Sequence, residues 1–336
     1  MKKNRRRVIV ITGASAGVGR ATAKAFARDG ARIALIARGR AGLNGARRDV
    51  EKLGGEALVL PLDVADATAI EKVADKIEQK LGPIDVWINN AMASVFSPIK
   101  EMSADEFKRV TEVTYLGYVY GTLAALKRML PRNRGLIIQV GSALAYRGIP
   151  LQSAYCAAKH AIKGFVDSLR CELIHDKSRV RVAMIDLPAM NTPQFSWVKS
   201  RLPRKAQPVP PIYQPEIAAE AIVYGSHHPR REIYVGMPTV GAITVNKVVP
   251  GLLDHYLAHF GYDSQQCDGR EDRHRPDNLW EPVDAEKDFG AHGNFDSRAA
   301  RHSPQLWTSM HRGWIVAAAL LLGGTALAAF LSRNRE

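Results

Sequence analysis

The sequence predicts a doubly wound α/β fold, in which helices cover both faces of a parallel sheet. Between residues 8 and 236, short apolar runs alternate with amphipathic segments of helical length. The runs are continuous and rich in β-branched residues, which is typical of parallel strands buried on both faces. The amphipathic segments end at glycine, a common helix stop. This alternation indicates right-handed βαβ units within one sheet.

Seven apolar runs are predicted to be the strands of this sheet. They are residues 8–12, 32–37, 57–62, 86–89, 136–140, 181–185 and 232–236. Helices are predicted between them, for example in "RATAKAFARDG" and "ATAIEKVADKIEQKLG". Residues 239–260 contain a further apolar stretch that we expect to be helical.

The alternation is interrupted between about residues 190 and 215. Six prolines stand there among aromatic and basic residues. We interpret the segment as a lid over the carboxyl ends of the strands. Phe195 and Trp197 would cover a ligand in that case, and the alternatives are ordinary packing or membrane contact.

Three parts are predicted along the chain: one folded domain at 1–260, a polar linker at 261–312 and a membrane-spanning helix at 313–332. The linker is predicted from its content of Asp, Arg, Gly and Pro. Residues 313–332 are uncharged, and a helix of that length would cross about 30 Å, the thickness of one hydrocarbon core. The run is apolar all round, whereas a core helix is usually amphipathic. Basic residues flank both ends, so they do not set an orientation.

Composition narrows the classes of partner. The formal charge of +14 includes the basic start "MKKNRRR" and would suit a phosphate-rich ligand, and we expect no specific nucleic-acid partner. Three widely spaced cysteines without a CxxC pair indicate free thiols in a reducing compartment. The ten histidines form no metal-ligand pattern, so we expect no metal site.

A glycine-rich turn follows the first predicted strand. In "TGASAGVG", Gly13, Gly17 and Gly19 separate the strand from a helix. A turn without side chains lets the backbone approach a pyrophosphate and directs helix N–H groups toward it. The position after a first strand favours a dinucleotide site over a tight turn without a ligand.

The residues at the ends of the second and third strands indicate which dinucleotide the protein binds. An acidic residue after the second strand would bond the ribose 2′-hydroxyl of NAD. Arg38 stands there instead, and a guanidinium suits the 2′-phosphate of NADP. We therefore predict NADP, with NAD as the alternative cofactor. Asp63, at the end of the third strand, would reach the adenine edge or cap a helix.

Three residues near the end of the fifth strand form a candidate reaction centre. Tyr155 and Lys159 share one helix face at i and i+4, and Ser142 ends the strand at the sheet edge where ligands bind. A phenol can transfer a proton to a developing alkoxide, and a neighbouring ammonium favours its ionised form. A serine hydroxyl can hold the substrate oxygen. These parts suit reversible carbonyl reduction with a nicotinamide.

Over about residues 8–240 the chain resembles the short-chain dehydrogenase/reductase family, in the branch with a TGxxxGxG turn and a YxxxK motif. The matching pieces are "TGASAGVG", "NNA" at 89–91, Ser142 and "YCAAK" at 155–159, in the family order. The resemblance implies a Rossmann-type fold, NAD(P) dependence, and catalysis by Ser142, Tyr155 and Lys159. It implies cofactor contacts at Gly13, Ser15, Gly17, Val18, Gly19, Arg38, Asp63, Asn89, Ala91, Tyr155, Lys159, Pro188 and Thr192. Family members often pair through helices near the tyrosine, so it also implies a homo-oligomer.

Three positions depart from the family pattern. Met92 replaces the glycine of NNAG, and Ala189 follows Pro188 where the family has glycine. Thr114 stands where the family has an asparagine thought to support a water that leads protons to the lysine. We expect Thr114 to alter or replace this relay.

The leading hypothesis is a membrane-anchored, NADP-preferring oxidoreductase that interconverts a ketone or aldehyde and an alcohol. The membrane span and the apolar lid favour a lipophilic substrate, and the free cysteines favour a cytoplasmic catalytic domain. One alternative is a dinucleotide-binding sensor or scaffold without efficient catalysis, which Met92 and Thr114 motivate. Another is an isomerase or dehydratase, but the short region after residue 190 leaves little room for a sugar-nucleotide domain.

Overall fold

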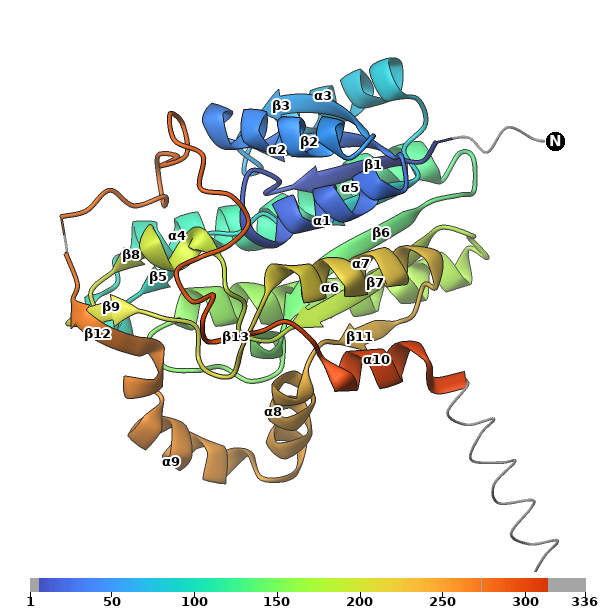
Figure 1. Cartoon of the computed structure of the whole chain (residues 1–336). Helices are drawn as coiled ribbons and strands as arrows, with labels where there is room; N and C mark the ends of the chain where they lie inside the picture. The colour runs from blue at the N-terminus through green and yellow to red at the C-terminus, as the bar shows by residue number, and fades with distance from the viewer. Residues whose placement is uncertain (1–5, 273, 314–336) are drawn as a thin grey trace, which may run out of the picture.

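A computed structural model of the chain describes residues 6–272 and 274–313. Its centre is a sheet of seven parallel strands, which confirms the predicted fold class (Figure 1). Each predicted strand lies within two residues of an observed one. In order across the sheet the strands are β11 (Glu232–Tyr234), β7 (Arg181–Leu187), β6 (Leu136–Ser142), β4 (Val86–Asn89), β1 (Val8–Thr12), β2 (Arg32–Ala37) and β3 (Glu56–Pro61).

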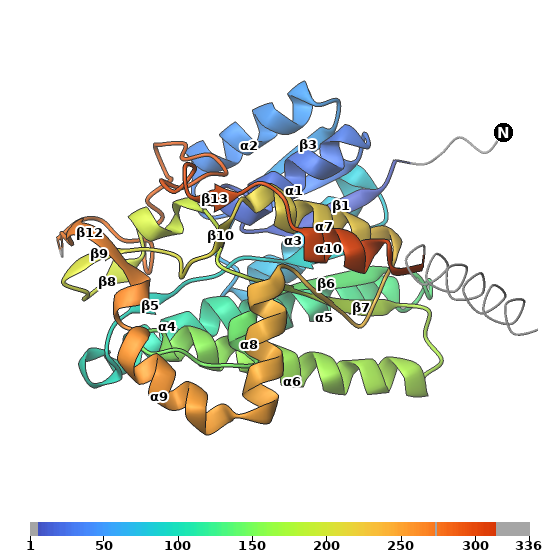
Figure 2. The same ribbon diagram turned by 60° about the horizontal axis from the view of Figure 1, so that its bottom comes forward.

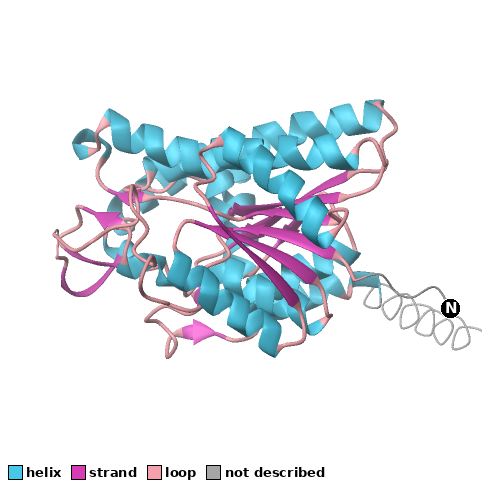
Figure 3. Cartoon of the chain, turned by 90° about the horizontal axis from the view of Figure 1, so that it is seen from above, coloured by secondary structure: helices cyan, strands magenta, loops and turns pink. Residues whose placement is uncertain are grey.

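Helices pack on both faces of the sheet (Figure 3). One face is covered by α3 (Ala67–Leu81), α4 (Ala104–Thr111), α5 (Gly117–Met129) and α6 (Ser153–His175). The other is covered by α1 (Gly17–Arg28), α2 (Arg40–Lys52), α7 (Pro215–His227) and α10 (Pro304–Met310). Because both faces are covered, the central strands β1, β4 and β6 are buried along their whole length. This explains why their sequences are continuous apolar runs.

The strand order reverses direction at β1. The chain runs outward from β1 through β2 to β3, and then returns to place β4 on the other side of β1. A crevice therefore opens beyond the carboxyl ends of β1 and β4, where the connecting segments diverge. The glycine-rich turn leaves β1 at this crevice, and the segment that begins with Asn90 leaves β4 there.

The proline-rich segment at 190–215 does lie beyond the carboxyl ends of the strands. It carries a 3₁₀ turn (Pro193–Ser196) and the short strands β8 (Lys199–Ser200), β9 (Arg204–Ala206) and β10 (Ile212–Tyr213). Strand β8 pairs with β5 (Val95–Phe96), β9 with β12 (Gln266–Arg270) and β10 with β13 (Ala299–Ala300). The segment is therefore held by sheet pairing with other parts of the chain.

The prediction of a polar linker at 261–312 is wrong. The chain after β12 returns across the carboxyl end of the sheet and reaches α10 on the face of α7 (Figures 1 and 2). Leu279 and Leu306 are buried in the two main cores. The polar side chains that suggested a linker instead bond the domain, for example Asp288 to Arg20 and Asp296 to Asn191. The folded domain therefore extends beyond residue 260.

The apolar stretch at 239–260 forms two helices instead of one. They are α8 (Met237–Val248) and α9 (Pro250–Phe260), which meet at Val249. Pro250 has no N–H and restricts the residue before it, so it begins a new helix and cannot continue the old one.

Among the described residues, no helix combines the length and the apolar character needed to cross a bilayer. The span predicted at 313–332 lies, apart from Gly313, outside those residues, and membrane attachment stays a prediction.

We predict that Leu279→Ala lowers the free energy of unfolding by about 2–5 kcal/mol, the usual cost of truncating a fully buried leucine. Urea denaturation of the full chain measures it. Glu286→Ala changes an exposed residue of the same segment and serves as the control. Equal, small effects of the two changes would contradict the packed arrangement.

Candidate active site

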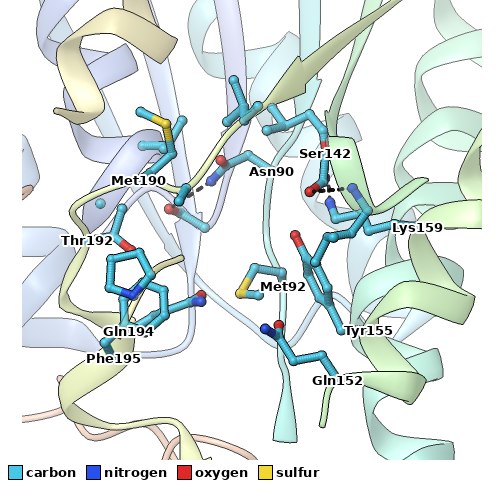
Figure 4. A pocket seen from close by; sticks show the side chains of 18 of the residues that line it. Asn90, Met92, Ser142, Gln152, Tyr155, Lys159, Met190, Thr192, Gln194 and Phe195 are labelled. Atoms are coloured by element: carbon cyan, nitrogen blue, oxygen red, sulfur yellow. Dashed lines mark hydrogen bonds between the residues drawn. The ribbon is translucent and has the colours of Figure 1, made fainter. Parts of the chain in front are cut away.

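A cavity of about 640 Å³ lies at the carboxyl end of the sheet. Its walls come from the turn after β1, the ends of β4 and β6, the start of α6, the segment after β7, helices α8 and α9, and residues 278–284. Figure 4 shows Ser142, Tyr155 and Lys159 on one side of this cavity, with Thr192, Gln194 and Phe195 on the opposite side.

The glycine-rich turn fits a dinucleotide. Gly13 and Gly17 adopt φ of +67° and +56°, in the left-handed region that favours glycine. A Cβ on Gly13 would lie 2.8 Å from the Cα of Ala91, so only glycine lets these two segments approach each other. Ser15 and Val18 line the cavity with them. Side chains do not obstruct the approach of a pyrophosphate to the backbone N–H groups of the turn, although the N–H of Gly17 already donates to the Gly290 carbonyl oxygen (3.2 Å).

Gly19 supports the turn from behind. It does not line the cavity, and a Cβ there would collide with the carbonyl oxygen of Gly13. Its contribution to cofactor binding is therefore the close packing of α1 against the turn, and not a direct contact.

Asn90, and not Asn89, faces the cavity. The Asn90 Nδ2 donates to the carbonyl oxygens of Thr12 (2.9 Å) and Gly13 (3.3 Å), which ties the end of β4 to the glycine turn. Asn89 is fully buried beneath the sheet edge, where it bonds Trp87 and Gln139. The placement of Asn89 along the cofactor is therefore wrong. In the motif "NNA" successive side chains point to opposite faces of the strand, and the sequence did not tell which one faces the ligand.

Arg38 and Asp63 both line the cavity, but each already has a partner in the protein. The Arg38 guanidinium donates to the carbonyl oxygen of Trp280 (2.6 Å) and to that of Asn278. The Asp63 carboxylate pairs with Arg109 and accepts from the backbone N–H of Ala65 (3.0 Å). Arg38, the residue predicted to bind the 2′-phosphate, thus lines the cavity, and its guanidinium bonds a segment that was expected to be a linker.

Ser142 and Tyr155 are brought together as predicted. Ser142 is the last residue of β6, and its Oγ accepts from the N–H of Leu144 (3.1 Å). Tyr155 lies in the first turn of α6. Burial raises the pKa of the Tyr155 phenol above its usual range, and the hydrogen bond with the Ser142 hydroxyl works in the opposite direction. The phenol therefore starts protonated, as a proton donor requires.

Lys159 lies one turn further along α6 and is fully enclosed. Its Nζ donates to the Val140 carbonyl oxygen (2.7 Å) and the Tyr118 hydroxyl (3.1 Å), and lies 5.5 Å from the centre of the Tyr155 ring. Burial lowers the pKa of Lys159 to about 7, and the nearby Asp186 carboxyl acts in the opposite direction. Burial thus brings the pKa of this amine toward neutral pH.

Sequence reasoning missed two polar groups near Lys159. Tyr118 lies on α5, and its hydroxyl donates to the Val140 oxygen (3.1 Å). Asp186 lies on β7 and accepts from the Tyr146 hydroxyl (3.2 Å), and burial raises its pKa to about 8. Both sit within apolar runs of sequence, and neither belongs to a recognised motif, so only the fold reveals their position.

Thr114 lies in a turn of π-helix (Glu112–Leu116) that joins α4 to α5. Its hydroxyl donates to the carbonyl oxygen of Ala93 (2.8 Å) and accepts from the N–H of the same residue (2.9 Å). Thr114 therefore fastens the segment after β4, and does not line the cavity. A relay through it to Lys159 stays a prediction.

The cavity is also lined by the remaining predicted contacts, which are Ala91, Pro188 and Thr192. Met92, which replaces the glycine of the family pattern, lines it too. Across the described part of the chain, no group of three His, Cys, Asp or Glu side chains is placed to hold a metal ion.

Comparison with known proteins agrees with this geometry. The family model described as short chain dehydrogenase matches residues 7–201. "Uncharacterized oxidoreductase YxnA" of Bacillus subtilis is 32% identical over 98% of this chain and 92% of its own length. The fatty acyl-CoA reductase of Acinetobacter baylyi is 32% identical over 71% of this chain and 79% of its own. A solved metagenomic short-chain oxidoreductase in complex with NADP has a TM-score of 0.58 and 26% identity, covering 68% of this chain and 96% of its own.

The chain therefore belongs to the short-chain dehydrogenase/reductase family. It is an oxidoreductase with the NAD(P)-binding fold of that family, which confirms the resemblance seen in its motifs.

The burial of Lys159 predicts a pH-dependent stability. In the unfolded chain a lysine has a pKa of about 10.4, whereas the pKa of Lys159 in the folded protein is about 7. Between these values the unfolded chain binds one more proton, so this group makes stability rise with pH. Lys159→Met removes the buried amine. We expect the variant to exceed the parent in stability at pH 6 by on the order of a few kcal/mol, with a smaller excess at pH 9.

Urea denaturation at the two pH values measures this difference. Lys76→Met, at an exposed lysine of α3, is the matched control and should show no such change with pH. A Lys159→Met effect that is the same at pH 6 and pH 9 would mean that the amine keeps its ordinary pKa.

Proposed function

We propose that the protein is an NADP-dependent oxidoreductase that interconverts a lipophilic ketone or aldehyde and the corresponding alcohol. The observation that carries this proposal is the grouping of Tyr155, Ser142 and Lys159 in the cavity that the glycine turn also lines. A proton donor, a hydroxyl that can hold an oxygen atom and a dinucleotide cradle thus open into one space.

The chain's own residues would manage the oxygen and its proton. A bound nicotinamide would supply or accept the hydride at the substrate carbon. Tyr155 would give its phenolic proton to the substrate oxygen during reduction and take it back during oxidation. The Ser142 hydroxyl would hold the same oxygen in place. The carbonyl thus gains one hydride and one proton and becomes an alcohol.

Lys159 would act mainly after the proton has left Tyr155. A phenolate beside the lysine would favour its protonated form, because opposite charges a few ångströms apart stabilise each other. The carbonyl oxygen of Val140 and the hydroxyl of Tyr118 hold the amine within reach of the Tyr155 ring. The pKa of about 7 lets Lys159 take up a proton at neutral pH when this charge develops.

Preference for NADP is proposed from Arg38. It lines the edge of the cavity beside the end of β2, where the 2′-substituent of the adenosine ribose would lie. A guanidinium can bind a phosphate in bidentate geometry. The bound NADP of the metagenomic relative supports the same cofactor class.

The walls away from the glycine turn support a lipophilic substrate. Ile149, Val245, Leu253 and Leu257 line the cavity with apolar side chains. Helices α8 and α9 also expose large apolar side chains at the surface, including Val248, Leu252, Tyr256 and Phe260. An exposed apolar surface on the two helices that line the cavity favours apolar substrates that approach from a membrane or a micelle. The fatty acyl-CoA reductase among the relatives is consistent with substrates of this class.

The alternative is a protein that binds the dinucleotide as a sensor and turns over little or no substrate. Met92 motivates it, because its side chain stands in the cavity where the family usually has glycine. This alternative predicts dinucleotide binding without oxidation of the cofactor in the presence of carbonyl compounds.

We predict that Tyr155→Phe lowers NADPH-dependent carbonyl reduction by at least about a hundredfold, because it removes the proton donor. NADPH binding should change much less. Steady-state absorbance measures the first and fluorescence titration the second. Tyr120→Phe, at a tyrosine of α5 outside the cavity, is the control. A Tyr155→Phe protein with full activity would refute the mechanism, and a parent that binds NADPH but reduces no carbonyl would favour the sensor.

We also predict that KM falls along a series of aldehydes from four to twelve carbons. Each buried methylene contributes about 0.8 kcal/mol to apolar transfer. Leu253→Ser, which places a hydroxyl on the apolar wall, should flatten the series, and Leu123→Ser, at an exposed leucine of α5, should not. A KM that does not depend on chain length would argue against a lipophilic substrate.

A further inference from the structure

Residues 278–290, which we call the strap, cross the edge of the cavity where the adenosine ribose would lie. Three successive carbonyl oxygens of the strap accept hydrogen bonds from the Arg38 guanidinium, namely those of Asn278, Leu279 (3.4 Å) and Trp280 (2.6 Å). The donors that would bind a 2′-phosphate are therefore already engaged by neutral acceptors of the chain itself.

The strap also covers the start of α2. The N–H of Gly42 donates to the carbonyl oxygen of Asp284 (3.2 Å), and the N–H of Ala41 donates to that of Ala285 (3.1 Å). The Asp284 carboxylate fills the space beside two glycines at the start of α2. A Cβ on Gly42 would come within 2.6 Å of its Oδ2, and a Cβ on Gly39 would collide with its Oδ1.

Asp284 thus places a buried negative charge at the 2′ edge of the cavity. The residue is 8% exposed and lines the cavity with Arg38 and Asp63. Among the charged groups that act on Arg38, Asp63, Asp284 and Glu281 are acidic and Arg109 is basic. A ribose 2′-hydroxyl can donate to a carboxylate, whereas a 2′-phosphate is repelled by one. The docked strap therefore opposes the preference that Arg38 alone would give.

We propose that Asp284 is a specificity-determining residue, which shifts the choice of cofactor from NADP toward NAD while the strap is docked. Full binding of the 2′-phosphate by Arg38 requires the carbonyl oxygens of residues 278–280 to release the guanidinium. The proposal rests on the proposed function only in that a dinucleotide binds in this cavity.

The far end of the strap is fastened independently of Arg38. Asp288 pairs with the buried Arg20, whose Nε also bonds Asp49 (2.9 Å). The Gly290 carbonyl oxygen accepts from the N–H of Gly17 (3.2 Å). Substitution of the Asp284 side chain leaves these bonds and the backbone bonds to α2 in place, so the variant should keep the strap docked.

The test is the affinity of the full chain for NADPH, NADH and 2′,5′-ADP, measured by calorimetry. For Asp284→Asn, which keeps the size of the side chain and removes its charge, we expect binding of NADPH and 2′,5′-ADP to tighten about tenfold. NADH should bind equally well or more weakly. Glu286→Gln removes an exposed charge two residues along the strap and should change none of the three affinities.

The possible results separate the two proposals. If the parent and Asp284→Asn bind dinucleotides with the same NADPH to NADH ratio, the role of Asp284 is refuted, and the proposed function stands where that ratio favours NADPH. If neither protein binds any dinucleotide, the proposed function fails and the inference fails with it. Circular dichroism and the urea midpoint establish that the variant is folded. If Asp284→Asn does not fold, Asp284→Ser is measured in the same way.

Discussion

The burial of one amine, that of Lys159, is the constraint on which the arrangement of the site depends. An ammonium removed from water needs partners, and here a neutral carbonyl and a phenol provide them. These partners stabilise the ammonium less than water does, so burial lowers the pKa of Lys159 to about 7. The amine can therefore change its charge at neutral pH beside a phenol that burial keeps protonated.

This constraint explains why the site is assembled from the end of β6, α5 and the start of α6. The carbonyl oxygen of Val140 lies near the end of the strand that also carries Ser142. Tyr118 comes from α5, which packs on the same face of the sheet as α6. The end of β6, α5 and the start of α6 must keep their positions for the amine to stay enclosed, and the parallel sheet holds them there.

Sequence reasoning predicted the sheet and the central part of the site because both depend on local patterns. Continuous apolar runs mark strands that are buried on both faces, and a tyrosine four residues before a lysine shares its helix face. It failed where the answer depends on which way a side chain points or on distant partners. The side chains of Asn89 and Asn90 point to different sides of the strand end, and only that of Asn90 faces the cavity. The hydroxyl of Thr114 is bonded to the backbone of Ala93, 21 residues away in the sequence.

The segment 261–312 shows why composition misled. Polar and charged residues indicate a linker only if their partner is water. Here Arg20 on α1 binds the carboxylate of Asp288, and Arg38 after β2 donates to carbonyl oxygens of the strap. These partners lie some 240 to 270 residues further along the chain. A basic residue at the edge of a phosphate site is an incompletely satisfied donor in the absence of its anion, and a polar segment that passes nearby can satisfy it. The same chemistry that would suit Arg38 to a cofactor phosphate thus lets the chain fold back upon the cavity.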